Sequence, residues 1–334
     1  MTEWTYSKAG VDIEKEATAI RSIADFCKAT FQNRPGEVLG DIGNFANLIS
    51  INDEQALVLC TDGVGTKVLV AEALKKYDTI GIDMVAMNVN DAICVGAEPI
   101  ALVDYLAVQK PTPELLSEIG KGVRAGADEA GIAVIGGETA TLPELIKGDG
   151  NGFDLAGTCL GVVDKDNLIT GEKIKVDDVL IGLPSSGLHS NGYTLARKVL
   201  DMEDKEVLEE MLIPTKIYVK PILKLLKHVP VHGLCHMTGG GLLNLLRLNK
   251  FMGFDIKNWP NHNWIFKQIR ELGNVSEEEM FKTFNMGVGF CVAVSPEHAD
   301  QAMDALRGEN PTILGKAIRG NKIVKNGLTF GGIE

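Results

Sequence analysis

The segment "TDGVGTK", residues 61–67, places an acid, two glycines and a lysine directly after an apolar run. An Asp-Gly pair is common at hairpin corners, and a lysine beyond it is ordinarily solvated. The same residues also supply what a phosphate and metal site needs, namely a carboxylate, bare backbone amides and an ammonium group. The rest of the sequence has to separate a plain turn from an anion site.

Three further glycine-bearing loops follow apolar runs: "GGETA" at 136–140, "PSSGLHSNG" at 184–192 and "HMTGGGL" at 236–242. One such loop is weak evidence, because glycine turns are common. Four loops, each with hydroxyl, acid, amide or imidazole neighbours, favour anion binding. None matches the Walker pattern or the G-x-G-x-x-G dinucleotide pattern in its strand-turn-helix setting. The sequence therefore predicts a phosphate site of another kind.

Three carboxylates lie where a metal-bound nucleotide could use them. Asp91 interrupts an otherwise apolar helical pattern over residues 78–96, and burying a carboxylate without partners is costly. Helix capping explains Asp91 poorly, because it lies in the middle of the pattern. Together with Asp62 and Glu138, each at the end or on the face of a buried element, it could bind a hard cation through oxygen. Mg²⁺ that bridges nucleotide phosphates is the natural candidate.

The histidines are better explained as parts of anion-binding loops than as ligands of a zinc ion. His232, Cys235 and His236 are close in sequence, but no second ligand pair has suitable spacing. His236 precedes the three-glycine loop, which fits an anion-binding role better. His189, in "SSGLHSN", is either a hydrogen-bonded loop histidine or an acid/base group for a phosphorylated substrate.

Composition bounds the class of protein. The 334 residues carry a net charge of -12 and are 45% apolar, which predicts a folded, two-domain protein and argues against a nucleic-acid surface. Six scattered cysteines without a C-x-x-C pair are typical of reduced core residues. The polar N-terminus and the lack of an apolar run of about 20 residues predict a cytoplasmic protein without a membrane span.

Strand and helix patterns alternate along the chain, which indicates an α/β or α+β fold. Charged and turn residues cluster over 164–178, and we place a domain boundary there, between domains 1–168 and 169–334. Periodicity predicts an amphipathic helix at 14–31, a hairpin from "FANLI" and "ALVLC", helices at 78–96 and 113–130, and strands at "PIALVDYLAV", "IAVIGG", "DLAGTCLGVV" and "VLIGLP". Later helices are expected from about residues 191 and 296, and "ILKLL" and "LLNLLRL" are interpreted as core helices.

Seven segments, in order, resemble the motifs of the phosphoribosylformylglycinamidine cyclo-ligase family, over about residues 6 to 320. The element with Asp91, Gly96, Ala97 and Pro99 is shared by a wider PurM-like superfamily of ATP-using enzymes. The opening, the "SSGLHSNGY" segment and "TFNMGVG" narrow the resemblance to the cyclo-ligase. Leu188 and "GGETATLPELI" depart from the family's usual pattern. The matching segments are "YSKAGVDI" (6–13), "DGVGTK" (62–67), "NDAICVGAEP" (90–99), "GGETA" (136–140), "SSGLHSNGYTLARK" (185–198), "TGGGLL" (238–243) and "TFNMGVG" (283–289).

The resemblance implies a two-domain PurM-like fold, in which a mixed N-terminal sheet forms a barrel across a homodimer and the C-terminal domain is an α/β sandwich. It implies ATP-dependent closure of formylglycinamidine ribonucleotide to 5-aminoimidazole ribonucleotide, with release of ADP and phosphate, in purine biosynthesis. Mg²⁺ and ATP are the expected cofactor and co-substrate, and K⁺ is a further candidate. The N-terminal domain would bind ATP and dimerise, and the C-terminal domain would bind the substrate.

On this hypothesis His189 and His236 are the acid/base candidates, and Asp62, Asp91 and Glu138 hold Mg²⁺. Lys67 is expected to contact the nucleotide phosphates. ATP would be bound by Asp62, Gly63, Gly65, Thr66, Lys67, Asp91, Gly136, Gly137 and Glu138. The substrate or its phosphate would be bound by Ser185, Ser186, Gly187, Ser190, Asn191, Thr238, Gly239, Gly240 and Gly241.

Two alternatives stay open. A small-molecule kinase of the thiamine-phosphate type would use the same superfamily machinery on another acceptor. A non-catalytic nucleotide-binding scaffold would bind without turnover, although it has no need to keep the metal-holding carboxylates.

Overall fold

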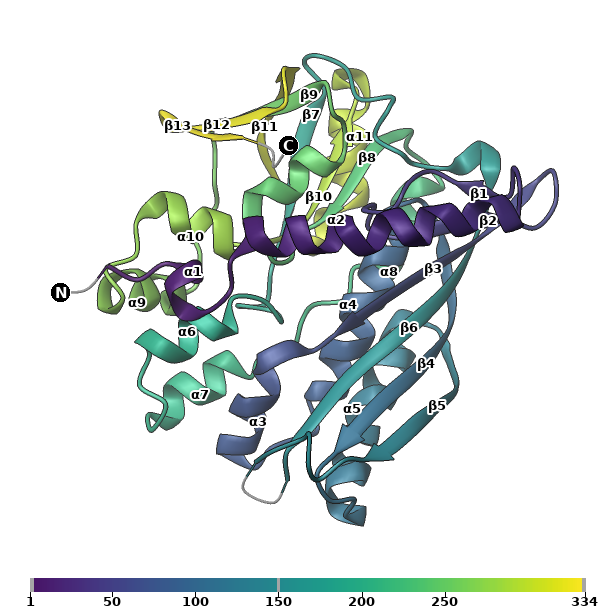
Figure 1. The fold of residues 1–334 in the computed structure, drawn as a ribbon. Helices are drawn as coiled ribbons and strands as arrows, with labels where there is room; N and C mark the ends of the chain where they lie inside the picture. The colour runs from purple at the N-terminus through teal and green to yellow at the C-terminus, as the bar shows by residue number, and fades with distance from the viewer. Residues whose placement is uncertain (1–2, 149–150, 332–334) are drawn as a thin grey trace.

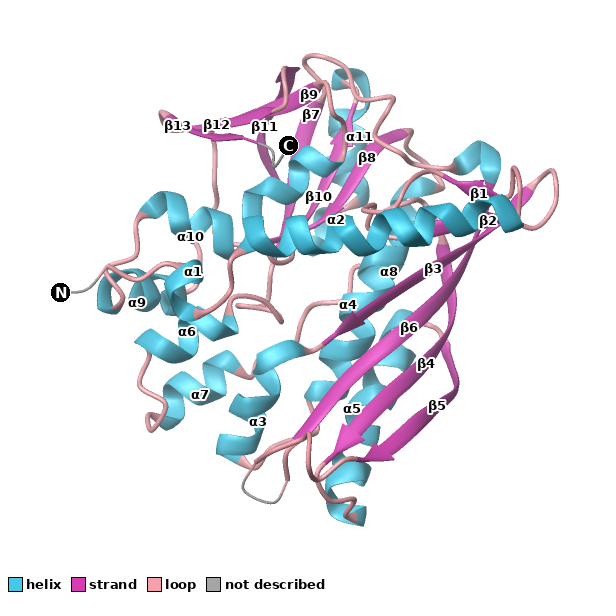
Figure 2. Cartoon of the chain, in the orientation of Figure 1, coloured by secondary structure: helices cyan, strands magenta, loops and turns pink. Residues whose placement is uncertain are grey.

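The structure is a computed structural model that describes residues 3–148 and 151–331, and it contains two mixed sheets with helices packed beside them (Figure 1, Figure 2). The N-terminal sheet has six strands and the C-terminal sheet has seven. In spatial order the first sheet consists of β1 (Val38–Leu39), β2 (Asn47–Ser50), β3 (Gln55–Gly63), β6 (Phe153–Asp164), β4 (Glu98–Val108) and β5 (Ala133–Thr141). The second consists of β13 (Leu328–Gly331), β12 (Lys322–Lys325), β9 (Met252–Ile256), β11 (Thr312–Arg319), β7 (Val179–Pro184), β10 (Val288–Val294) and β8 (Val231–His236).

The predicted α/β layering is confirmed, with eleven α-helices among the described residues. They are α1 (Tyr6–Ala9), α2 (Ile13–Ala29), α3 (Val68–Leu74), α4 (Ile80–Ile93), α5 (Pro113–Ala130), α6 (Tyr193–Val199), α7 (Lys205–Met211), α8 (Val219–Leu226), α9 (Trp264–Leu272), α10 (Glu277–Thr283) and α11 (Ala299–Ala305). None of the described helices is both long and apolar enough to cross a membrane.

Helices α4 and α5 cover one face of the N-terminal sheet (Figure 1). Helix α4 is buried on nearly every side, which explains its almost continuous run of apolar residues. The two helices approach closely at glycines. A Cβ on Gly81 would lie 2.1 Å from the backbone nitrogen of Val123, and one on Gly122 would lie 2.6 Å from the carbonyl oxygen of Asp78. Only glycine permits this backbone contact.

The opposite face of the same sheet is uncovered and apolar. Residues alternate along β6 between buried positions, which face α4, and half-exposed ones, as expected for a sheet covered on one side. On the uncovered face Leu59, Val103 and Tyr105 keep 42%, 38% and 43% of their surface exposed. We refer to this uncovered face of β3, β6, β4 and β5 as the outer sheet face.

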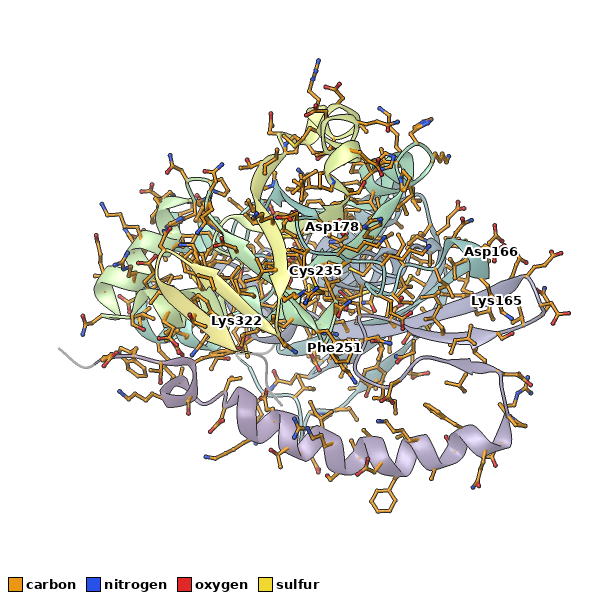
Figure 3. The ribbon with its side chains drawn as sticks, turned by 90° about the horizontal axis from the view of Figure 1, so that it is seen from above. Lys165, Asp166, Asp178, Cys235, Phe251 and Lys322 are labelled. Atoms are coloured by element: carbon orange, nitrogen blue, oxygen red, sulfur yellow. The ribbon has the colours of Figure 1, made fainter. Side chains whose placement is uncertain are left out.

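Helix α2 runs along one side of the molecule and is set apart from the strands in the view from above (Figure 3). The predicted helix is confirmed. Its large apolar side chains are nevertheless exposed: Ile20 at 59%, Ile23 at 63% and Phe26 at 80%. Apolar periodicity therefore located the helix, while Ile20, Ile23 and Phe26 stay exposed among the described residues.

Most predicted elements occur at the expected positions. The hairpin is formed by β2 and β3, which pair antiparallel from Asn47 opposite Leu59 to Ser50 opposite Ala56. The exception is "LLNLLRL", where η4 (Gly241–Arg247) is a 3₁₀ helix rather than an α-helix. Gly240 precedes it and Gly241 begins it, with φ of +94° and +51°. Asn244 bonds back to the glycine loop, so the segment is wound around that loop.

Candidate active site

The centre of the candidate site is a contact between the two halves of the chain. Nδ1 of His236, at the end of β8, lies 2.8 Å from Oδ1 of Asp91 on α4. His236 is completely buried, while the Asp91 side chain keeps 15% of its surface exposed. Nε2 of His236 is 3.5 Å from the Asn90 amide nitrogen. The carboxylate is thus oriented by the imidazole and still reaches the surface.

Asp62 is held beside this pair by the backbone. The Asp62 N–H donates to Oδ1 of Asn88 at 3.0 Å, and the Asn88 amide donates to the Asp62 carbonyl at 3.1 Å. Opposite Asp62 on β6 stands Gly157, where a Cβ would lie 2.5 Å from Sδ of Met84 and 3.0 Å from the Asn88 amide. The glycine therefore lets α4 come close enough for Asn88 to fix the end of β3.

The two carboxylates influence each other. Burial, followed by the negative charge of Asp91, raises the pKa of Asp62 from 3.8 to about 6, while the Gly63 N–H and the His236 and Arg247 charges oppose the rise. Such a pair gains from a cation that neutralises it. Two carboxylates suit Mg²⁺, which typically takes one or two from the protein and fills its other positions with phosphate and water oxygens. No cluster of three or more His, Cys, Asp or Glu that could hold a metal ion occurs among the described residues.

The structure separates Glu138 from Asp62 and Asp91. Glu138 lies opposite Tyr105 on β4, and Tyr105 lies opposite Ala156 on β6. This row belongs to the outer sheet face, whereas Asp62, opposite Gly157, faces α4. Residues one position apart on paired strands point to opposite sides of a sheet. Within one chain the structure therefore brings Asp62 and Asp91 together and places Glu138 on the other face of the sheet. Gly136 and Gly137 lie on the same exposed strand, β5.

The structure places Lys67, which was predicted to contact the nucleotide phosphates, inside the protein. Lys67 ends the 3₁₀ turn η2 (Gly65–Lys67), and its side chain is completely buried. Its Nζ lies 2.9 Å from Oδ1 of Asp83, 3.1 Å from the carbonyl oxygen of His189 and 2.6 Å from that of Ile213. These three acceptors occupy the ammonium group. In contrast Gly63, Gly65 and Thr66 remain partly or fully exposed, and Gly65 adopts φ +66°.

The loop after β7 is organised by hydrogen bonds to "TFNMGVG". Asn285 accepts from Oγ of Ser185 at 3.0 Å, and its amide donates to the carbonyls of Gly187 and Leu188 at 2.9 and 3.2 Å. The hydroxyl of Ser186 donates to the Pro214 carbonyl. The predicted loop residues 185–191 therefore form one rigid turn, with Ser185, Ser186 and Asn191 partly exposed.

His189 is a buried part of this turn. Its backbone is left-handed, with φ +62°, and its Nε2 accepts the Ser186 N–H at 3.1 Å. In the neutral ring Nδ1 then carries the hydrogen, and it has no hydrogen-bond partner within the described structure. Burial, with the charges of His236, Lys67 and Lys216, lowers the pKa of His189 well below 6.5. The ring is therefore neutral at pH 7 and acts as an acceptor for the loop backbone.

The three-glycine loop packs directly on this turn. A Cβ on Gly239 would lie 3.0 Å from Oδ1 of Asn191, so the glycine allows the contact. The Asn244 amide donates to the carbonyls of Thr238, Gly239 and Gly241, at 3.0 to 3.3 Å. The two C-terminal loops predicted to bind phosphate are thus adjacent, and Thr66 joins them from the N-terminal side with Oγ1 3.4 Å from Oγ1 of Thr194.

Comparison with known proteins identifies the family of this chain. Residues 43–163 match the family described as AIR synthase related protein, N-terminal domain, and residues 175–325 match its C-terminal domain. A phosphoribosylformylglycinamidine cyclo-ligase of Pyrococcus horikoshii is 54% identical over 96% of this chain and 97% of its own length. One of Methanococcus maripaludis is 52% identical over 92% of this chain and 89% of its own length. The chain belongs to the phosphoribosylformylglycinamidine cyclo-ligase family.

Several solved structures share this fold. Thiamine-monophosphate kinase from Stenotrophomonas maltophilia aligns with a TM-score of 0.62 and 20% identity over 91% of this chain and 95% of that one. Hydrogenase maturation protein HypE, in a structure with ATP, aligns with a TM-score of 0.60 and 17% identity, over 82% and 83%. At these identities the likeness establishes the PurM-like fold alone, so the cyclo-ligase family is distinguished by sequence and not by fold.

Sequence reasoning missed several residues that build the site of this cyclo-ligase family member. They share one property, which is that each makes a hydrogen bond that helps to hold a loop in place. No local pattern distinguished Asp83 from other polar residues on helices. Asn285 could have been found, because it lies within the segment "TFNMGVG". The missed residues are Asp83, Thr215, Asn244, Arg247 and Asn285.

Proposed function

We propose that this chain closes the imidazole ring of formylglycinamidine ribonucleotide with ATP, giving 5-aminoimidazole ribonucleotide, ADP and phosphate. The observation that carries the proposal is the Asp91–His236 contact, which joins a carboxylate pair on the N-terminal half to two glycine loops on the C-terminal half. The names of the relatives, over nearly the full length of the chain, give the reaction.

The chemistry requires an activated oxygen. Attack of the amidine nitrogen on the formyl carbon would have to expel an oxide, which is a poor leaving group. Transfer of the ATP γ-phosphoryl to the formyl oxygen makes phosphate the leaving group, and ring closure then breaks the C–O bond. Phosphoryl transfer depends mostly on positioning and on charge compensation, which loops of this kind provide.

Asp62 and Asp91 are the residues that would hold Mg²⁺ on the nucleotide phosphates. When bound, the ion would compensate charge on the transferred phosphoryl group. The amides of Gly63, Gly65 and Thr66 are available for the nucleotide, because this turn remains accessible. Lys67 is left out of this assignment, since its ammonium group is occupied.

The C-terminal loops are assigned to the ribonucleotide. Ser185, Ser186 and Asn191 are partly exposed on the turn after β7 and lie next to the loop of Thr238 to Gly241. Such backbone amides and hydroxyls suit a phosphate ester. Gly187 and Ser190 shape this turn. His236 orients Asp91, and His189, neutral and buried, supports the loop; proton transfer by either ring would require exposure that they lack in this state.

A homodimer through the outer sheet face is part of the proposal. This face exposes Leu59, Val103 and Tyr105, and contiguous apolar patches of this kind commonly mark interfaces. The edge strand β5 is also exposed along its length, which single chains usually avoid. Glu138 and the glycines beside it would then lie in the interface, where Glu138 could approach a nucleotide only as part of the assembled dimer.

The test is the release of ADP and phosphate from Mg²⁺-ATP with and without formylglycinamidine ribonucleotide, together with formation of the aminoimidazole amine. Release that depends on the substrate and matches the amine one to one is expected. A phosphorylated product that accumulates would instead favour the kinase alternative. Nucleotide binding without any turnover would favour a scaffold.

A further inference from the structure

The completely buried Lys67 is shared between three segments. It comes from the turn that follows β3 in the N-terminal half, yet two of its three acceptors, the carbonyl oxygens of His189 and Ile213, belong to the C-terminal half. The third acceptor, Asp83 on α4, is equally buried and lies 2.9 Å away. Two opposite charges of the N-terminal half are therefore enclosed where the halves meet.

Asp83 accepts hydrogen bonds from the same C-terminal segments. Its Oδ1 accepts from the backbone nitrogen of Thr215 at 2.7 Å, from Oγ1 of Thr215 at 2.7 Å and from Oγ of Ser190 at 3.2 Å. The hydroxyls of Ser190 and Thr215 are themselves 2.9 Å apart. One carboxylate oxygen and one ammonium group thus hold residues 189, 190, 213 and 215 in a single arrangement.

Stability alone is a poor reason for such a pair. Removing two charges from water is costly, and apolar side chains of similar volume often stabilise a core as well or better. Oδ2 of Asp83 is buried without a hydrogen-bond partner among the described residues, so all of these bonds meet at Oδ1. Such bonds fix orientation, because each donor must meet the same acceptor. His189 is where orientation matters most, since its φ of +62° is unfavourable for a residue with a Cβ. Its carbonyl oxygen is the one that Lys67 binds.

We propose that Lys67 and Asp83 are positioning residues for the substrate: they hold the left-handed backbone of His189 and the Ser190 hydroxyl. In this way they aim the turn of residues 185–191 at the phosphate of the ribonucleotide. That the ligand is the ribonucleotide phosphate rests on the proposed function. That Lys67 and Asp83 hold the turn in one conformation rests on the hydrogen bonds alone.

The test compares Lys67→Met, Asp83→Asn and the double variant. Each single change leaves one buried charge without its partner and lowers the melting temperature. The double variant removes both charges and regains most of that loss. Its KM for the ribonucleotide nevertheless rises by roughly ten- to hundredfold, because a small misplacement of binding groups is costly. Its KM for ATP changes much less.

The control is Lys220→Met, which removes a lysine that also bridges the two halves, through the Asp128 carbonyl at 3.2 Å. It leaves both KM values unchanged. If the double variant does not fold, Thr215→Val serves instead, because it removes one hydrogen bond to Asp83 and no charge. A smaller rise in the ribonucleotide KM is then expected. Wild-type KM values in a stable double variant would reduce the pair to a structural role.

A readout without catalysis separates this inference from the proposed function. In the free protein, backbone amides of residues 185–191 exchange with deuterium faster in the double variant than in the wild type, while those of β10 do not. Unchanged exchange would overturn the inference even if the enzyme makes the amine. Faster exchange in a protein that makes no amine would show that the pair orders the turn, while the proposed function and its ligand fail.

Discussion

His236 and Asp91 are 145 residues apart in sequence, yet Nδ1 of the imidazole lies 2.8 Å from Oδ1 of the carboxylate. The contact joins the end of β8 to the last turn of α4. The position of the Asp91 carboxylate therefore depends on how the two halves of the chain pack. On the proposed function, a site built in this way would bring ATP and the ribonucleotide to one place only in the folded protein.

The charge of Asp91 can be tested without disturbing this contact. In Asp91→Asn the amide oxygen still accepts from His236, so the melting temperature should change little. ATP turnover should fall by about a hundredfold or more, because a group that compensates phosphoryl charge is lost. Substrate-dependent ADP release and a thermal melt measure the two effects. Full activity of this variant would exclude Asp91 from the site.

Asp62 should make the metal-free protein less stable as the pH rises. Its pKa is raised from 3.8 to about 6 on folding, so the folded state binds the proton more tightly than the unfolded state. The stability that this gives is complete below pH 3.8 and is lost as the pH rises through 6. Relative to Asp62→Asn, the wild type should lose about 3 kcal/mol of unfolding free energy over this range.

Urea unfolding in the presence of a chelator, at several values of pH from 3 to 8, measures that difference. Saturating Mg²⁺-ATP should then stabilise the wild type more than Asp62→Asn at pH 8. A gap between the two proteins that does not depend on pH would contradict the assigned pKa.

The close contact between α4 and α5 should make two glycines respond in opposite ways. Gly81→Ala places a Cβ within 2.1 Å of the Val123 backbone nitrogen, and the helices must move apart, at a cost of about 3 kcal/mol. Gly120→Ala lies on the same helix pair with nothing within 4 Å of its Cβ, and it should gain about 0.5 to 1 kcal/mol from helix propensity. Melting temperatures of both variants decide this. Equal effects would mean that the helices do not pack at Gly81.

The sequence predicted the elements better than it predicted the directions of the side chains. Apolar periodicity located α4, α5, β4 and the β2–β3 hairpin, because burial of a face is a local property of the pattern. The chain does turn at η2, directly after β3. Lys67 nevertheless points inward, because its partner Asp83 and the carbonyl of His189 become its neighbours only on folding.

The position of Glu138 could not be read from the sequence for a similar reason. A strand exposes alternate residues on opposite faces, so grouping Glu138 with Asp62 required the register of β5, β4, β6 and β3, which no local pattern contains. By contrast, the three "SSGLHSN", "TGGGLL" and "TFNMGVG" segments do lie together, as a resemblance over the whole chain implies. Motifs locate a site, whereas the contacts that support it come from the fold.

The outer sheet face gives the last prediction. Val103 lies on β4, the strand between β6 and β5, and is 38% exposed, so Val103→Glu should place a charge within the proposed dimer interface. Burying an unpaired carboxylate costs several kcal/mol, which is enough to shift a dimer strongly toward monomer. Sedimentation should show the wild type at twice its chain mass of 36.0 kDa and the variant at about one chain mass. Leu272→Glu, at an exposed leucine on α9, is the matched control and should remain dimeric.

If the dimer carries the nucleotide site, Val103→Glu should also lose ATP turnover. The loss should be smaller at high protein concentration, because mass action restores the dimer. A Val103→Glu protein that stays dimeric would move the interface away from the outer sheet face.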